Sequence, residues 1–538
     1  MNAVAKILGA DVELGNVLQH RESGAWPNDA AARLLLAQID GVPSRGAVVS
    51  NGYGSAAYGS YGYGSFASTN YGYSGRSASA ADSVDPQDWG RKFLDTSGGC
   101  FYIDLGHLEA CIPEVCSARD FVAAHHANLR LARAACTAAN QRLARRAEAG
   151  ERRIAVMANN SDRLGQSWGG HLNVLVTRTL WNQFFDRMYP QLFVLAAFQV
   201  SSIVYTGQGK VGAENGKERV DFQITQRGDF FECLVGEQTT CRRPVCNSRD
   251  EAHVGAGASR HDLARLHVIF HDTTLTHVSN YLKAGVTQLV LAMLESGWCD
   301  VQLVLDDPLD ALTRWGHDPE LRAPAPLADG RSVTAVEHQQ IFAAAARRFV
   351  EAGQAEHIPE ADQILALWED TLEKLSRHDF EALVPRLDWV LKRALLERLL
   401  ERDTTLGWHS NAVRAADLRF ANLDPAEGLY WAVEAGGGVE RIVSDADIER
   451  AMHEPPVDTR AWSRTTLLRQ LGRDRIDSVN WDQIRLTPRT AGGDATVIRL
   501  DDPRRFTRAE LRRLSEPAAA GAEKSAAGSH NPEEGPAS

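Results

Sequence analysis

The sequence predicts an α+β fold in which one curved, largely antiparallel sheet packs on helices and turns its other face to a cleft. Two observations support this fold class. Several short segments alternate polar and apolar residues, which places the two kinds of side chain on opposite faces of a strand. Longer segments carry apolar residues at helical spacing opposite a charged stripe.

Residues 101–109 form the segment around which we expect the fold to be organised. In a strand, Tyr102 and Asp104 share one face. The apolar side chains of the other face should enter the core: Phe101, Ile103 and Leu105. The polar residues from 106 onward then bring Glu109 back toward Asp104. One carboxylate that acts as base or nucleophile, beside another that holds a hard cation, suits metal-assisted chemistry. The alternative is a half-buried strand with a solvated polar face.

Other segments show the same alternation. Residues 7–15 place two acids, Asp11 and Glu13, on one face, and residues 265–270 place Arg265 and His267 on the polar side. Further strands are expected at residues 154–157, 170–174 and 221–227. It is hard to explain so many strands with one polar and one apolar face as solvated edges of a sheet. A single sheet whose polar face lines a cleft is the more economical arrangement.

Helices are expected over six segments: residues 117–146, 181–198, 278–295, 334–352, 361–376 and 380–402. The first of these begins with Ser117 and Asp120, which have the spacing of a capping box. The last four segments each carry a charged stripe opposite an apolar one. We therefore interpret them as scaffold that supports the sheet.

A chain of 538 residues is too long for one ordinary core, which predicts a large domain over 1–404 and a small C-terminal domain over 405–507. From 43 to 88 the composition changes to Gly, Ser and Tyr, which cannot bury enough apolar area to offset the entropy of ordering. A flexible loop is expected there, and a mostly disordered tail over 508–538. The loop's functional alternative is a flap over a site or a self-associating segment.

Charge and cysteine content exclude several classes of protein. With 58 basic and 70 acidic residues the net charge is -12, which argues against a general nucleic-acid binder. The eight cysteines form no CxxC pair and have no accompanying His spacing, so we expect reduced, mostly buried thiols and neither a zinc site nor a disulfide framework. No signal-type or membrane-spanning apolar segment is evident, and we expect a cytoplasmic protein.

Four motifs follow one another along the chain. The first is Phe101-Tyr102-Ile103-Asp104 with His107-Leu108-Glu109 and Pro113-Glu114. The others are Arg242-Arg243-Pro244 with Asn247-Ser248-Arg249-Asp250-Glu251-Ala252-His253, then Arg265-Leu266-His267-Val268-Ile269, and Pro455-Pro456-Val457-Asp458-Thr459-Arg460-Ala461. Together they resemble the Pup ligase and Pup deamidase family, the PafA and Dop proteins of the prokaryotic ubiquitin-like pathway. The resemblance extends from the first strand to about Thr487.

This resemblance implies a glutamine-synthetase-like curved sheet that binds ATP and Mg²⁺ in its concavity. Asp104 matches the family's catalytic carboxylate. Three residues match positions that hold magnesium in the family: Asp11, Tyr102 and Glu109. Two further candidates for the metal site match family histidines: His171 and His267. Trp481 matches an aromatic nucleotide contact. Four arginines are candidates for clamping phosphate and carboxylate groups: Arg227, Arg249, Arg265 and Arg460.

The chain departs from the family pattern at six positions: Asp11, Cys100, Leu108, Leu172, His271 and Thr274. Asp11 stands in place of Glu, which keeps an oxygen ligand but shortens its reach. Cys100 stands in place of an Arg that contacts nucleotide in the family, so one cationic donor to phosphate is absent. Leu108, Leu172, His271 and Thr274 stand in place of Pro, Glu, Gly and Asn.

Two features resemble the deamidase branch. Asp104 and Glu109 are five positions apart rather than six, and the insertion at 43–88 sits where deamidases carry a loop. The implied activity is ATP- and Mg²⁺-dependent hydrolysis of an amide, either the C-terminal Gln of Pup or its isopeptide bond, with Asp104 as nucleophile or as base for water. Two alternatives stay open: an ATP-dependent ligase of carboxylate and amine, and an inactive homologue that binds peptide or nucleotide.

Overall fold

The computed structural model describes residues 4–20, 24–26, 28–43, 91–145, 152–187, 190–251, 253, 262–299, 303–488 and 495–504. The loop predicted at 43–88 lies outside the described residues except for Pro43, and so does the tail predicted at 508–538. In the part that is described, no helix has both the length and the apolar character to cross a membrane. The cytoplasmic location stays a prediction.

Nine strands of the described chain form one sheet in which every pairing is antiparallel. Its main path runs β13-β8-β1-β6-β5-β4-β3, and β2 and β7 also pair with β1. The bounds are β1 Leu8–His20, β2 Gly24–Trp26, β3 Val42–Pro43, β4 Lys92–Phe93, β5 Cys100–Asp104, β6 His107–Cys111, β7 Arg152–Met157, β8 Gly170–Thr177 and β13 Leu263–Val268. The predicted α+β class with a mainly antiparallel sheet is confirmed.

Strand β1 connects the parts of this sheet. Its first half pairs with β6 on one side and β8 on the other, and its second half pairs with β7 and β2. Side chains of a strand alternate between faces. The register through β1 therefore decides which polar residues of the neighbouring strands lie next to Asp11 and Glu13.

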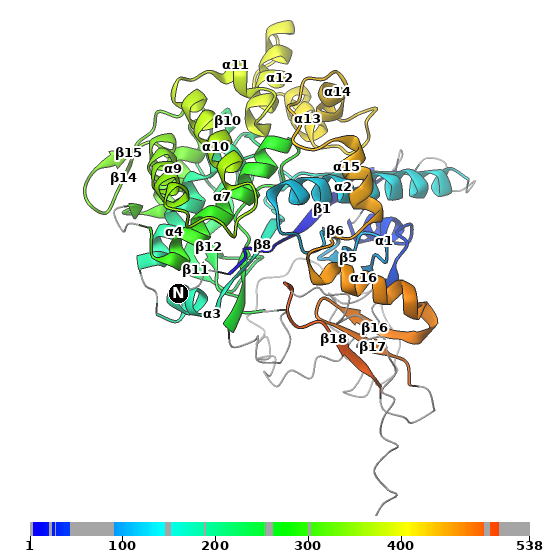
Figure 1. Ribbon diagram of the computed structural model, residues 1–538. Helices are drawn as coiled ribbons and strands as arrows, with labels where there is room; N and C mark the ends of the chain where they lie inside the picture. Colours follow the sequence, from blue (N-terminus) through cyan, green and yellow to red (C-terminus); the bar gives the residue numbers. More distant parts are fainter. Residues whose placement is uncertain are drawn as a thin grey trace, which may run out of the picture.

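One face of the sheet is apolar and is covered by helices α2 (Ala118–Ala144) and α7 (His277–Ser296). Leu8 and Leu172 belong to the same buried cluster as both helices. Figure 1 shows α2 as a long cyan helix beside β1. The Ser117 hydroxyl caps α2 by accepting from the backbone N–H of Asp120. The sequence predicted both this helix and its N-terminal cap.

Most of the other helices extend the apolar core on the side of β8 and β13. Their bounds, with the smaller α1, are α1 Asn28–Leu36, α3 Arg178–Phe185, α4 Pro190–Ser201, α5 Ile203–Thr206, α8 Pro308–Gly316, α9 Ala335–Glu351, α10 Ala361–Ser376, α11 Phe380–Leu383 and α12 Asp388–Arg402. Short strand pairs lie among them: β9 Lys210–Val211 with β10 Phe222–Gln223, β11 Phe231–Gly236 with β12 Arg243–Asn247, and β14 Ala325–Pro326 with β15 Ser332–Val333.

The C-terminal elements are α13 Asn411–Phe420, α14 Leu429–Ala435, α15 Asp445–His453, α16 Arg460–Leu471, β16 Ile476–Asn480, β17 Gln483–Leu486 and β18 Val497–Arg499. The last three form a separate antiparallel sheet. Its Ile476 and Ile484 share a buried cluster with Phe93, Cys100 and Cys111 of the main sheet. In Figure 1 this orange sheet lies near β5, with α16 between them. The domain division at residue 404 stays a prediction.

Three local predictions were wrong, each because of a turn or a proline. Leu105 does not enter the core: it is 69% exposed in the turn between β5 and β6. The helix predicted over 181–198 is two helices, the second of which begins at Pro190, a residue suited to the first helical position but not to an interior one. The helix predicted over 380–402 is also divided, into α11 and α12, with Pro385 in the connection.

The strand predicted over 221–227 is confined to Phe222–Gln223. Asp272 is the reason. Its carboxylate accepts the backbone N–H groups of Gln226 at 2.8 Å and Arg227 at 3.2 Å, and the Thr225 hydroxyl at 3.0 Å. A distant carboxylate thus satisfies the backbone donors that a longer strand would have used.

Glu114 joins the segment after β6 to helix α16. Its carboxylate accepts from Arg460 Nε at 2.7 Å and from Arg464 Nη2 at 2.7 Å and Nη1 at 3.1 Å. Burial alone raises the pKa of this carboxyl, but Arg464 and Arg460 outweigh burial and lower it to about 2. Because Glu114 is buried, the pair of arginines would lose their counter-charge if it were removed.

We expect Glu114→Gln to lower the free energy of unfolding at pH 7 by about 3 kcal/mol, since a buried ion pair loses one member. The folded-state pKa lies below the unfolded value. The carboxylate's contribution is therefore present above about pH 4.5 and is lost as the pH falls toward 2. Urea unfolding followed by circular dichroism between pH 7 and pH 3 measures both effects. Equal unfolding free energies of variant and wild type at pH 7 would contradict this account.

Candidate active site

The polar face of the sheet brings together residues from β1, β5, β6 and β8. Asp11 of β1 lies opposite His171 of β8 on one side and Cys111 of β6 on the other. In the same way, Glu109 of β6 lies between Glu13 of β1 and Tyr102 of β5. Residues directly opposite each other in antiparallel strands have side chains on the same face and close together. The predicted convergence of Asp11, Tyr102 and Glu109 is therefore present.

A tight turn places Asp104 beside these residues. Asp104 and His107 are paired at the end of the β5–β6 hairpin, and the two turn residues have left-handed backbones, with φ 44° at Leu105 and 88° at Gly106. Two-residue hairpin turns with both φ values positive match the twist of the strands. Asn16 secures the turn: its Nδ2 donates to Gly106 O at 3.1 Å and its Oδ1 accepts from Leu108 N at 2.8 Å.

Three carboxylates meet at this turn. One oxygen each of Glu13, Asp104 and Glu109 lie within 4.8 Å of one another. Burial and the charge of Asp104 raise the pKa of Glu13 to about 7, against the opposing N–H of Gly169, which donates to Glu13 Oε2 at 2.7 Å. Burial, Glu13 and Asp11 raise the pKa of Glu109 well above its usual range. Such a cluster is unfavourable without a cation.

Asp11 also belongs to a second group, with His171 and His267. Asn173 links two of its members: the Asn173 Nδ2 donates to Asp11 Oδ2 at 2.8 Å, and the Asn173 Oδ1 lies 2.8 Å from Nδ1 of His267. This contact leaves Nε2 as the ring nitrogen of His267 that is available to a ligand, as is usual for metal-binding histidines. Gly169 makes room for the other histidine, because a Cβ there would lie 1.9 Å from His171 Nε2.

The four arginines predicted to bind phosphate are held by protein acceptors. Arg265 donates to Asn173 Oδ1 at 2.8 Å and, with Arg249, pairs with Glu251. Arg227 is buried, donates to the carbonyl of Ile269, and has its pKa lowered to about 9 by burial and the nearby Arg243. Their role toward phosphate stays a prediction.

Arg460 and Trp481 lie at the C-terminal sheet. Arg460 donates hydrogen bonds to the Glu114 carboxylate and to the carbonyls of His253 and Leu500. Trp481 is half-buried, with the guanidinium of Arg464 4.9 Å from its ring centroid. Among the described residues, neither side chain forms a hydrogen bond with the cluster of Glu13, Asp104 and Glu109. A ligand that contacts both this cluster and Trp481 would therefore have to extend along the sheet.

The sequence singled out Asp11 as a site residue. It did not predict that four further residues contribute to the same site: Glu13, Asn173, Gly169 and Arg243. Glu13 was visible as the second acid on the first strand. Asn173 and Gly169 carried no such signal, because their roles depend on the pairing of β1 with β8. Arg243, whose Nε donates to Thr239 O at 2.8 Å, influences Glu13 through its charge.

Some family departures leave the polar face intact. Leu108 and Leu172 are buried in the two apolar clusters on the opposite face of the sheet. Cys100 is buried beside the site, and the guanidinium of Arg91 lies 4.3 Å from the ring centroid of Tyr102. A cation is thus present next to β5 although position 100 provides none.

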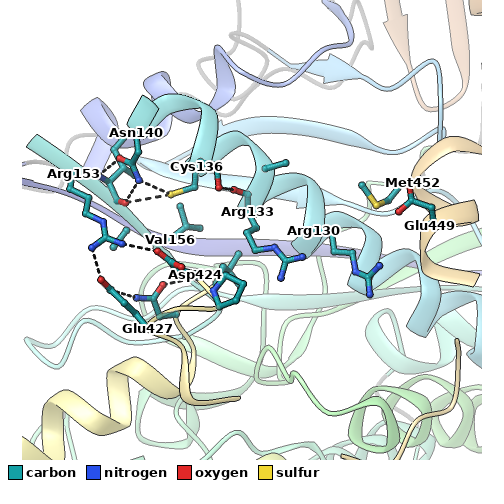
Figure 2. A pocket seen from close by; sticks show the side chains of 17 residues that line it. Arg130, Arg133, Cys136, Asn140, Arg153, Val156, Asp424, Glu427, Glu449 and Met452 are labelled. Atoms are coloured by element: carbon teal, nitrogen blue, oxygen red, sulfur yellow. Dashed lines mark hydrogen bonds and ion pairs between the residues drawn. The ribbon is translucent and has the colours of Figure 1, made fainter. Parts of the chain in front are cut away.

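A pocket of about 500 Å³ lies elsewhere, between α2, β7 and the chain after α13. Figure 2 shows Arg153 of this pocket paired with Asp424 and Glu427. The N–O distances of these ion pairs are 2.7 Å to Asp424 and 2.5 Å to Glu427. None of the predicted site residues lines it. We therefore locate the candidate active site on the polar face of the sheet, where carboxylates converge.

The donor set of the polar face fits hard divalent cations. Carboxylate oxygens predominate, and Oε2 of the buried Glu109 has no hydrogen-bond partner among the described residues. Mg²⁺ prefers oxygen ligands and is usually held by one or two carboxylates, with water and substrate oxygens completing its shell. Asp11, Glu13, Asp104 and Glu109 would hold such ions.

Comparisons with known proteins point to one family. The sequence model of a family described as "Pup-ligase protein" matches residues 6–485. The chain is 35% identical over 412 residues to a depupylase of Acidothermus cellulolyticus, covering 76% of this chain and 78% of that protein. It is 34% identical to the Pup deamidase/depupylase of Mycolicibacterium smegmatis (78% and 80% covered) and 33% identical to a Pup–protein ligase of Kineococcus radiotolerans (74% and 85% covered).

Solved structures agree in fold. The complex between the prokaryotic ubiquitin-like protein Pup and its ligase PafA matches with a TM-score of 0.75 at 23% identity, covering 95% of this chain and 92% of that chain. A structure of the Pup ligase PafA in complex with ADP matches with a TM-score of 0.67 at 25% identity, covering 79% and 89%.

We expect Glu13→Gln to stabilise the metal-free protein at pH 8 by about 1 to 3 kcal/mol, because one of three crowded charges disappears. The pKa of Glu13 in the folded protein lies above its unfolded value. The wild type therefore becomes less stable as the pH rises from about 4.5 to about 7 and Glu13 loses its proton, whereas the variant does not. The same change should weaken stabilisation by Mg²⁺.

Thermal unfolding with EDTA and with Mg²⁺ checks both parts. Glu218→Gln, a change at an exposed glutamate, is the control. A variant that is less stable than wild type at pH 8 in EDTA would show that the carboxylate cluster is not repulsive.

Proposed function

The chain belongs to the Pup-ligase protein family, and on this premise we propose that it is an ATP- and Mg²⁺-dependent amide hydrolase. Its substrate would be the C-terminal Gln of Pup, or of a Pup-like small protein, or the isopeptide bond that joins this protein to a target. The observation that carries the proposal is the meeting of Glu13, Asp104 and Glu109 at the β5–β6 turn.

The residues of the polar face would divide the work. Asp104 lies at the end of β5 on a turn fixed by Asn16, where it would attack the amide carbonyl or take a proton from water. Glu13, Glu109 and Asp11 would hold Mg²⁺, which when bound supplies positive charge for phosphate oxygens and for a polarised carbonyl. Asn173 would orient Asp11 and His267.

ATP is proposed as the nucleotide because a related ligase is described in complex with ADP. Arg227, Arg249 and Arg265 would supply charge-assisted donors to phosphate or to a substrate carboxylate. Arg91, close to Tyr102, is a further cation at the position where Cys100 provides none. Trp481 would contact the nucleotide base. Pup as partner rests on the names of the relatives, which describe proteins that act on or join to Pup.

Two observations favour hydrolysis over ligation. The two relatives compared above that are named for removing or deamidating Pup are slightly more similar than the ligase. The five-residue separation of Asp104 and Glu109 resembles the deamidase pattern, and here it is accommodated by a two-residue turn. A Pup-type ligase is the second candidate, because ligases match at nearly the same identity.

We expect Asp104→Asn to reduce turnover by roughly 10²- to 10⁴-fold or more, since the carboxamide is neither a base nor a nucleophile. The assay incubates the full chain with ATP, Mg²⁺ and a Pup-like peptide ending in Gln, and mass spectrometry follows conversion of the terminal amide to the acid. Asp362→Asn, at an exposed helical position, is the matched control. Persistent conversion by Asp104→Asn would remove this residue from the mechanism.

A parallel assay separates the two enzymatic candidates. With a Pup-like peptide ending in Glu and an amine acceptor, the proposed hydrolase should release no stoichiometric ADP and phosphate. Release coupled to a new isopeptide bond would identify a ligase instead. An absence of both reactions, with nucleotide still bound, would favour a binding protein.

A further inference from the structure

A cysteine thiol faces the same polar surface as the carboxylates. Cys111 is the last residue of β6, and its Cα partner in the sheet is Asp11 of β1. The Sγ of Cys111 and one oxygen each of Asp11 and Glu109 lie within 4.8 Å of one another. This group shares two members with the oxygen-rich positions described above but adds a donor of different chemistry.

The group combines a buried carboxylate oxygen that has no donor among the described residues with an opening to solvent. Glu109 is only 2% exposed, and its Oε2 has no hydrogen-bond partner within the described parts of the chain. Asp11, in contrast, is only half-buried, so the group is open to solvent on that side. A buried carboxylate oxygen without a donor is costly unless a cation occupies the space in front of it.

The surroundings of the thiol favour a soft cation. Cys111 belongs to the apolar cluster that includes Ile476, Ile484 and Leu467 of the C-terminal elements, which keep water from its buried side. Mg²⁺ takes oxygen ligands and retains water, whereas Zn²⁺ binds thiolate and carboxylate together in a compact four-coordinate shell. A thiolate beside two carboxylates therefore favours Zn²⁺ over Mg²⁺.

We propose that Cys111, Asp11 and Glu109 form a binding site for a thiophilic divalent cation such as Zn²⁺. The Cys111 thiol gives its proton to solvent and its sulfur binds the metal, while Asp11 and Glu109 contribute one oxygen each and water occupies the fourth position. Because Asp11 and Glu109 are also the residues expected to hold Mg²⁺, the two ions compete, and Zn²⁺ inhibits any reaction that needs Mg²⁺ here.

The site does not depend on the reaction proposed above, and its test needs no substrate. The metal-stripped full-length protein is titrated with Co²⁺, a spectroscopic substitute for Zn²⁺, in the absence of nucleotide. We expect a thiolate-to-cobalt charge-transfer absorption that one equivalent of Zn²⁺ abolishes. Mg²⁺ in large excess should weaken Co²⁺ binding without producing the absorption.

Cys111→Ser should lose the absorption and weaken Zn²⁺ binding by roughly tenfold or more, as measured by competition with a chromophoric chelator. Cys100→Ser is the matched control. Cys100 is equally buried and lies directly opposite Cys111 on β5, but its Sγ is outside the group of three donors. This variant should keep both the absorption and the affinity.

Asp11→Asn removes a different donor and decides the matter if Cys111→Ser does not fold. It should weaken Zn²⁺ binding and the charge-transfer absorption together, whereas a site formed by other cysteines would be unaffected and a site of Asp11 with His171 and His267 would give no thiolate absorption at all. The proposal is overturned if wild type shows no charge-transfer absorption, if Cys111→Ser keeps it, or if Cys100→Ser loses it to the same extent.

Discussion

Mutual repulsion of carboxylates on one face of an antiparallel sheet is the constraint on which the rest of this structure depends. Glu13, Asp104 and Glu109 are close enough to share an ion, and Glu109 is only 2% exposed and Glu13 9%. Burial and neighbouring charges both raise the pKa of Glu13 and Glu109. A cation resolves this conflict, because it replaces repulsion by attraction in a place where water cannot screen the charges.

The scaffold around this cluster is built to resist that repulsion. Strand β1 pairs along its whole length, and the apolar faces of β1, β6 and β8 pack on α2 and α7. The amide of Asn173 in β8 and the N–H of Gly169, directly before β8, donate to the acids. At the far end of the sheet, Glu114 binds two arginines of α16 and so attaches the C-terminal elements to the strands that carry the site.

This arrangement also explains why the chain can differ from its relatives without losing the site. Leu108 and Leu172 point away from the cluster into the apolar core, where a change of side chain alters packing rather than ligation. Cys100 and Cys111 do face the polar side, next to apolar residues of the C-terminal sheet. Of these two, Cys100 is the departure from the family, and its Sγ lies outside the groups of possible metal donors, so the change there removes a cationic side chain and leaves the carboxylates in place.

The sequence by itself determined the α+β class, the long capped helix α2, and the pairing of Asp11 with Glu13 and of Tyr102 with Asp104 on the polar faces of their own strands, because alternation and helical spacing are local properties. Only the tertiary structure decided that Glu13 joins Asp104, that Asn173 links Asp11 to His267, and that Arg460 is held by Glu114. It also ended the strand after Gln223 and exposed Leu105. These outcomes depend on which strand pairs with which and in what register, and on distant groups such as Asp272 that compete for backbone hydrogen bonds, none of which a local pattern encodes.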